Sequence, residues 1–134
     1  MFLKDRRQHV AEKIVPALAS GHVVILDRYY FSTMAYQGAR GFDPQEIRRK
    51  NEAFAPVPDV LIILDLDVNT AIQRIGARGD TANEFEQRAN LERCRDIFLS
   101  LKDESFVRVI SANSSPDDVT KMIITALAHP FSHT

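Results

Sequence analysis

Residues 23–38 read VVILDRYYFSTMAYQG, an apolar run that leads directly into a polar and aromatic segment. Four consecutive apolar residues at 23–26 predict a strand buried on both faces, as strands of parallel sheets are. The segment that follows, from Phe31 to Gln37, predicts a helix. A strand that leads into a helix is the repeating unit of an α/β fold.

The rest of the chain continues this alternation of strand and helix. Apolar residues recur at four-residue spacing in several segments, which is typical of helices that cover a sheet. Further strands are predicted at 60–66 and 106–110, and the predicted helices are 3–19, 31–37, 44–54, 70–78, 84–101 and 115–128. We expect one domain over residues 1–134, built as a parallel sheet flanked by helices, with a frayed tail from His129.

Capping residues mark several of the predicted helix ends. Asp43 predicts an N-cap, followed by Pro44 at the first helical position and by Glu46, which is placed to complete a capping box. Asn69 predicts the N-cap of the next helix, and Gly21 predicts the C-terminal end of the first one.

Composition is that of an ordinary globular domain. Of 134 residues, 45% are hydrophobic and 26% are charged, and the net charge is −1. This balance gives no general affinity for nucleic acid or for a membrane surface. With one cysteine, no signal peptide recognised and no apolar run of membrane-spanning length, we expect a cytoplasmic protein.

Asp27 and Arg28 end the first predicted strand. Ligands of open α/β sheets bind beyond the carboxyl ends of the strands. There an aspartate can hold Mg²⁺ through water, and an arginine can bind phosphates with its planar guanidinium. The alternative is an ion pair that only closes the end of the strand.

Two pairs of residues have the spacing that places side chains on one helix face. Ser32 and Tyr36 are four apart, next to Gln37, and so are Phe2 and Arg6. Aromatic rings can stack on a base, while glutamine and arginine can bond its edge. The alternatives are an aromatic side chain that belongs to the core and a solvated, charged helix end.

Arg74 and Arg78 also share one face of a predicted helix, just before a polar stretch. Two arginines in such a place can stabilise the charge of a triphosphate during phosphoryl transfer. A solvated basic face explains the same pattern without any ligand.

Taken together, these residues resemble the thymidylate kinase family. The similar segments are MFLKDRRQHV at 1–10, PALASGHVVILDR at 16–28, DRYYFSTMAYQGARGF at 27–42 and VPDVLIILDLDVNTAIQRIGARG at 57–79. Adenylate kinases and deoxynucleoside kinases share the architecture but lack the run from DRY to AYQG. The resemblance covers about residues 2–101 and implies a P-loop-kinase-like fold.

The resemblance implies a role for each matching residue. Arg28 would bind the phosphates of donor and acceptor, and Asp27 would help to organise Mg²⁺, through water, together with that arginine. Phe2 would stack on thymine, while Arg6 would bond its carbonyl edge. Tyr36 would pack beside the deoxyribose and disfavour a 2′-hydroxyl.

Further matching residues complete the implied site. Ser32 and Gln37 would line the thymidine pocket, and Arg74 and Arg78 would belong to the lid over ATP. Several bacterial relatives carry another lid arginine where this chain has Gly76, which implies a smaller positive cluster.

The implied function is that of a dTMP kinase in dTTP biosynthesis, which converts ATP and dTMP to ADP and dTDP with Mg²⁺. We expect adenine contacts in the loop at 111–115. Family members usually dimerise, and the apolar stripe of Val10, Ile14 and Leu18 suits either a homodimer interface or the core. No nucleic-acid or membrane partner is expected.

One element of the family is missing from these 134 residues, the GxxxxGK[ST] loop that holds the β- and γ-phosphates of ATP. We therefore expect an N-terminally truncated kinase that is inactive alone. The family's sheet has the strand order 2-3-1-4-5, and its first two strands would be absent. The strands at 23–26 and 60–66 would then leave a gap, pair directly, or accept a partner's strand.

Two other readings stay open. The chain could be a fragment that binds a nucleoside monophosphate or a partner chain without doing chemistry. It could also be a different nucleotide kinase, although the run DRYYFSTMAYQG argues against this.

Overall fold

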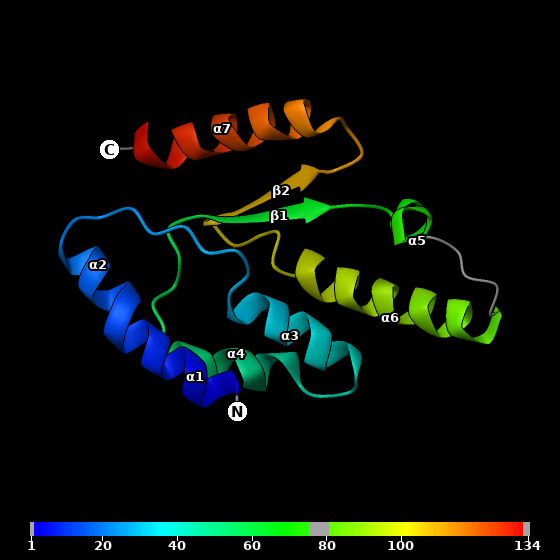
Figure 1. Ribbon diagram of the computed structural model, residues 1–134, viewed down its shortest axis with the longest axis horizontal. Coiled ribbons are helices and arrows are strands. Elements are labelled where there is room, and N and C mark those ends of the chain that lie inside the picture. Colours follow the sequence, from blue (N-terminus) through cyan, green and yellow to red (C-terminus); the bar gives the residue numbers. More distant parts are fainter. Residues whose placement is uncertain (1, 76–80, 133–134) are drawn as a thin grey trace.

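The computed structural model describes residues 2–75 and 81–132. Its sheet has two parallel strands, β1 (Leu61–Asp65) and β2 (Val107–Ser111), which pair from Leu61 opposite Val107 to Asp65 opposite Ser111. Figure 1 shows α7 on one side of this sheet, and α3, α4 and α6 on the other. The predicted class, a parallel sheet flanked by helices, is confirmed.

The described helices correspond to the predicted ones, with bounds that differ by a few residues. They are α1 (Phe2–His9), the π-helical turn η1 (Val10–Ile14), α2 (Val15–Ala19), α3 (Tyr30–Ala39), α4 (Pro44–Glu52), α5 (Val68–Ile75), α6 (Thr81–Leu99) and α7 (Pro116–Ser132). The final helix was predicted to end at about residue 128, whereas α7 continues to Ser132. None of the described helices is long and apolar enough to span a membrane.

The first predicted helix is one continuous rod made of α1, η1 and α2. Its π-helical turn ends two residues before Pro16, whose ring would clash with the carbonyl four residues earlier in a regular α-helix. Gly21 ends the rod with a φ of 82°, where its N–H donates to Leu18 O and that of His22 donates to Ala17 O. This is the Schellman pattern predicted for a C-terminal glycine.

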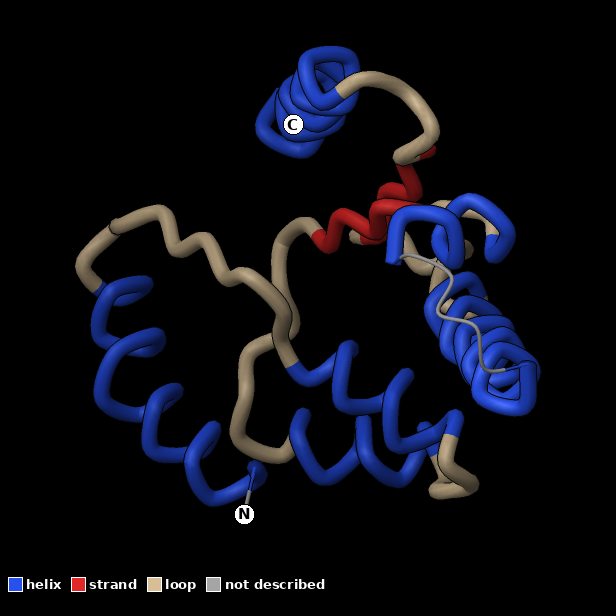
Figure 2. The backbone as a smooth tube through the Cα atoms, turned by 45° about the vertical axis from the view of Figure 1, so that its right-hand side comes forward, coloured by secondary structure: helices blue, strands red, loops and turns tan. Residues whose placement is uncertain are grey.

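The predicted strand at 23–26 was wrong. These residues form no ladder, and Val23 and Ile25 are 83% and 88% exposed. Figure 2 shows the segment crossing to α3 as a loop outside the two-stranded sheet. An apolar run can be buried on both faces only between neighbouring strands, and none of the described residues supplies a neighbour.

The core lies under α3. Tyr30, Phe31 and Met34 of this helix are buried, and the Tyr30 and Phe31 rings lie 4.2 Å apart between centroids. The buried cluster consists of Val10, Ile14, Tyr30, Phe31, Met34, Ala55, Ile63, Leu101 and Val107. Because α3 carries so much of the core, its solvent-facing side is held in a fixed orientation.

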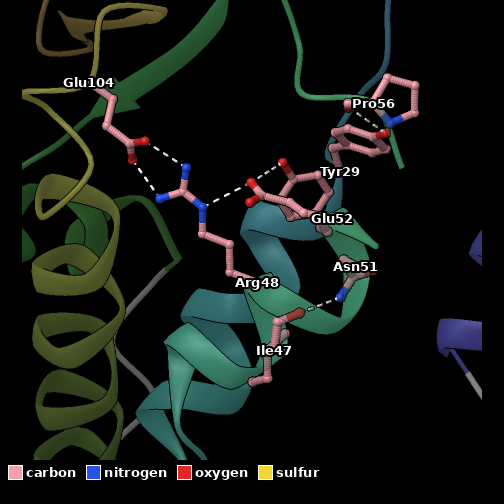
Figure 3. Close-up of polar contacts among 8 residues, drawn as sticks. Tyr29, Ile47, Arg48, Asn51, Glu52, Pro56 and Glu104 are labelled. Atoms are coloured by element: carbon pink, nitrogen blue, oxygen red, sulfur yellow. Dashed lines mark hydrogen bonds and ion pairs between the residues drawn. The ribbon is translucent and has the colours of Figure 1, made fainter. Parts of the chain in front are cut away.

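A polar network joins α3, α4 and the turn before β2 (Figure 3). The Arg48 guanidinium donates two bonds of 2.6 Å to Glu104 and one of 2.9 Å to Glu52, which also accepts from the Tyr30 hydroxyl at 2.7 Å. The bonds from Arg48 lower the pKa of Glu104, and burial, aided by Glu52, raises that of Tyr30. The network fixes α4 against the core.

Two capping predictions need correction, and one is confirmed. Asp43 caps α4 by accepting from Gln45 N at 3.0 Å, but Glu46 bonds Arg49 rather than the backbone of the cap. The N-terminus of α5 is capped by Asp67, whose carboxylate accepts from the Thr70 backbone N–H and hydroxyl. Asn69 instead accepts from Arg88.

Candidate functional site

A pocket of about 330 Å³ lies where α1, α3 and α4 meet. Its walls include Arg6 from α1 and Gln37 from α3, both predicted to bind substrate. The lining residues are Leu3, Arg6, Thr33, Gln37, Phe42, Asp43, Glu46, Ile47, Lys50 and Asn51. Two predicted residues, 31 positions apart in sequence, therefore share one pocket.

The Arg6 guanidinium is held between two helices. Its Nη1 donates to Asn51 Oδ1 of α4 at 2.8 Å, and its Nη2 donates to Thr33 Oγ1 of α3 at 3.1 Å. Burial lowers the pKa of Arg6, an effect partly opposed by the Tyr29 hydroxyl. An arginine stays charged under such a shift, so the pocket contains a fixed cation.

Arg28 and Tyr36 are in contact. The Arg28 Cζ lies 5.4 Å from the centre of the Tyr36 ring, within the range of a cation–π interaction. Arg28 has a φ of 69°, the only positive φ of a non-glycine residue among those described. A bulky residue held in this conformation costs energy, and such residues concentrate at binding and catalytic sites.

Helix α3 connects the pocket and the arginine–tyrosine pair. Thr33 and Gln37, one turn apart, line the pocket, while Tyr36 contacts Arg28. Ser32, predicted to line the same pocket, is half-buried, and its N–H donates to Tyr29 O. It does not line the pocket.

Phe2 lies in the first turn of α1, but its side chain falls outside the described part of the structure. The α1 position places it one turn before Arg6 along the same helix.

Arg74 lies beyond the carboxyl ends of the two strands. Its Nη2 donates to Ala112 O at 3.2 Å, so it contacts the 111–115 loop where adenine contacts were expected. Nearby, Arg95 makes two bonds of 2.8 and 2.9 Å to Asp65 at the end of β1, which lower the pKa of that carboxyl. Arg78 and Gly76 lie outside the described residues.

The fit of Mg²⁺ to this chain can be judged from its carboxylates. Among the described residues, no three histidine, cysteine or acidic side chains gather as a metal site. Asp27 is exposed beside Arg28. Since Mg²⁺ is usually held by one or two carboxylates, waters and substrate phosphates, Asp27 suits a metal that arrives with a nucleotide.

The pocket contains residues that sequence analysis missed, notably Thr33 and Asn51. Thr33 could have been found, because it precedes Gln37 by one helical turn and therefore shares its face. Asn51 left no such signal. It is a polar residue in a charged helix, and its importance follows from a contact with Arg6, 45 residues earlier.

The parallel sheet flanked by helices defines an α/β protein. Comparison with protein families narrows this class. The family model for thymidylate kinase matches residues 1–123, so this chain belongs to the thymidylate kinase family.

Individual relatives agree with this assignment. The chain is 50% identical over 131 residues to a thymidylate kinase of Akkermansia muciniphila and 48% identical over 136 residues to one of Xanthomonas euvesicatoria pv. vesicatoria, and each match covers 98% of the chain. A Xylella fastidiosa thymidylate kinase is 51% identical over 119 residues, or 89% of the chain.

A solved structure has the same fold. The crystal structure of thymidylate kinase from Ehrlichia chaffeensis matches with a TM-score of 0.72 at 27% identity, covering 94% of this chain and 63% of the other. The three curated relatives are covered over 63%, 59% and 56% of their own lengths. The chain thus spans about three fifths of the length of the curated relatives it matches.

Proposed function

We propose that this chain carries the dTMP-binding part of a kinase that converts ATP and dTMP to ADP and dTDP in dTTP biosynthesis. The observation that carries the proposal is the fixed guanidinium of Arg6 in a pocket shared with Gln37. Family membership supports the reaction class.

The chemistry of the pocket suits a thymine base. A guanidinium has five N–H donors, of which Arg6 uses two on Asn51 and Thr33, so the remaining donors are available to a ligand acceptor. Thymine offers carbonyl oxygens along this edge, whereas cytosine presents an amino group that would face donor with donor. The Gln37 amide can add a further bond, and the Phe42 ring offers an apolar surface.

The opposite end of the ligand would lie toward Arg28. A monophosphate is an anion, and the Arg28 guanidinium lies over the Tyr36 ring of α3 without a bond to a protein oxygen in the described part of the chain. Tyr36 then lies where the sugar would pass, and its ring would leave little room for a 2′-hydroxyl. Asp27 would hold Mg²⁺ through water, as the metal neutralises phosphate charge.

Fewer residues of this chain are candidates for contacts with ATP. Arg74, with Arg78 by resemblance, would contact the triphosphate, and the loop at 111–115 would contact adenine. The 134 residues contain no GxxxxGK[ST] loop, and phosphoryl transfer depends on such positioning. We therefore expect negligible turnover from the 134 residues alone, which favours, as a second candidate, a module that binds dTMP without chemistry.

A homodimer would use α2 rather than the whole apolar stripe. Val10 and Ile14 are buried in the chain's own core, whereas Val15 and Leu18 are 45% and 41% exposed. Among the described side chains of the first helix, these are the exposed large apolar ones, and a homodimer interface would use them.

Isothermal titration of the chain with dTMP tests the proposal. Arg6→Leu should weaken binding about 10- to 100-fold, because it removes a charged donor from a partly buried site. Arg108→Leu is the control, since the Arg108 side chain bonds only the neighbouring backbone carbonyls of Ser105 and Val107, away from the pocket. Failure of the unaltered chain to bind dTMP at millimolar concentration would overturn the proposal.

A further inference from the structure

Asn51 is the one buried polar residue among the side chains that the structure describes, at 2% exposure. Both ends of its amide are bonded. Its Nδ2 donates to Ile47 O at 2.8 Å, one turn earlier in α4, and its Oδ1 accepts from Arg6 at 2.8 Å. A buried amide is tolerated only when it is bonded in this way.

These two partners fix which way the amide points. A backbone carbonyl accepts only, so the NH₂ group must face Ile47 (Figure 3), and the oxygen is left for Arg6. The reversed amide would place its donors against the N–H groups of the guanidinium. Asn51 therefore presents an acceptor to Arg6 in a direction set by the backbone of α4.

The bond from Asn51 affects how the Arg6 guanidinium is oriented in the pocket. Arg6 is long and flexible, and it would lose this orientation if one of its two anchors were removed. Thr33 alone, at 3.1 Å, leaves the guanidinium free to turn about a single contact. With Asn51 in place, two contacts hold the guanidinium, so its remaining N–H donors keep one direction.

We propose that Asn51 is a positioning residue that sets the base preference of the pocket by holding the Arg6 guanidinium in one orientation. The inference rests on the proposed function, because it takes the ligand to be a pyrimidine monophosphate. Asn51 acts through Arg6, so its removal affects the choice between a carbonyl-bearing and an amino-bearing base more than it affects the phosphate end.

Two substitutions separate positioning from a merely structural role. Asn51→Leu and Asn51→Asp both abolish the bond to Ile47 O, but only aspartate keeps an oxygen acceptor for Arg6. Asn69→Leu is the control, because Asn69 accepts from Arg88 at 2.7 Å in an exposed asparagine–arginine pair outside the pocket.

The first measurement is ¹⁵N relaxation and exchange of the Arg6 guanidinium in the ligand-free chain. Hindered rotation is expected in the unaltered chain, in Asn51→Asp and in Asn69→Leu, with free rotation in Asn51→Leu. Free rotation in the unaltered chain, or unchanged hindrance in Asn51→Leu, would overturn the proposal, whether or not the chain binds dTMP.

The second measurement is the ratio of dissociation constants for dCMP and dTMP. Asn51→Leu should lower this ratio tenfold or more, whereas Asn51→Asp and Asn69→Leu should keep it within about threefold. An unchanged ratio in Asn51→Leu would show that Asn51 supports the fold but does not set the base preference. If the unaltered chain binds neither nucleotide, the proposed function fails, and the guanidinium measurement alone decides the positioning role.

Discussion

The Arg28 guanidinium lies over the Tyr36 ring, with 5.4 Å between Cζ and the ring centre, and the two residues are eight positions apart in sequence. Arg28 reaches this position with a positive φ, in the bend that follows the loop 22–26. A guanidinium held in this way is suited to bind the phosphate of the proposed ligand, and the measurements below test this role.

Arg28→Ala should weaken dTMP binding while leaving thymidine binding nearly unchanged. The substitution removes a cation that would contact the phosphate but not the base, and a charge-assisted bond of this kind changes affinity about 10- to 100-fold. Titration calorimetry with both ligands gives the ratio. Equal losses for dTMP and thymidine would remove Arg28 from the phosphate site.

Tyr36→Ala should reduce the preference for dUMP over UMP, two ligands that differ only in the 2′-hydroxyl. The ring would otherwise occupy the space beside the sugar, so its removal admits the hydroxyl. Tyr36→Phe retains the ring and should keep the preference. If Tyr36→Ala discriminates as well as the unaltered chain, Tyr36 does not contact the sugar.

Arg48→Leu should lower the free energy of unfolding by about 1–3 kcal/mol, since it leaves Glu104 and Glu52 without their partly buried partner. Arg49→Leu is the matched control in the same helix. Arg49 is 72% exposed and pairs with Glu46, so its removal should cost less than about 1 kcal/mol. Urea denaturation gives both values, and equal costs would contradict the role of the network.

Acid should destabilise the fold through Glu104. Arg48 lowers the pKa of Glu104 in the folded state, so the unfolded state takes up a proton first as the pH falls. The stabilisation is complete above the unfolded pKa of about 4.3 and is lost as the pH falls through the lower folded value. Glu104→Gln should therefore flatten the decline in stability between about pH 5 and pH 3. An unchanged decline would show that the pKa of Glu104 is the same in the folded and unfolded states.

Much of the fold could be predicted because helices and their ends are determined largely by residues close in sequence. The Asp43 cap and the Gly21 end depend on a few neighbouring residues, and both are seen. Whether Asp67 or Asn69 caps α5 is not decided by neighbouring residues alone, because it depends on the path that the chain takes after β1. Sequence spacing alone could not decide it.

The strand predicted at 23–26 failed for a related reason. Its apolar side chains indicate an affinity for burial, but a strand exists only when a neighbour supplies backbone partners. The site shows the same division. Arg6 could be predicted as a site residue from its four-residue spacing to Phe2. Asn51 could not, because its contact with Arg6 joins segments 45 residues apart and is seen only in the structure.

The central claim is that the pocket between α1, α3 and α4 binds the thymine of dTMP. Intermolecular nuclear Overhauser effects in the labelled chain with dTMP test it most directly. The account predicts effects from the thymine methyl and sugar protons to side chains of the pocket, notably Thr33, Gln37 and Phe42. Effects confined to the separate hollow lined by Arg40, Glu86 and Arg93, or none at millimolar dTMP, would contradict it.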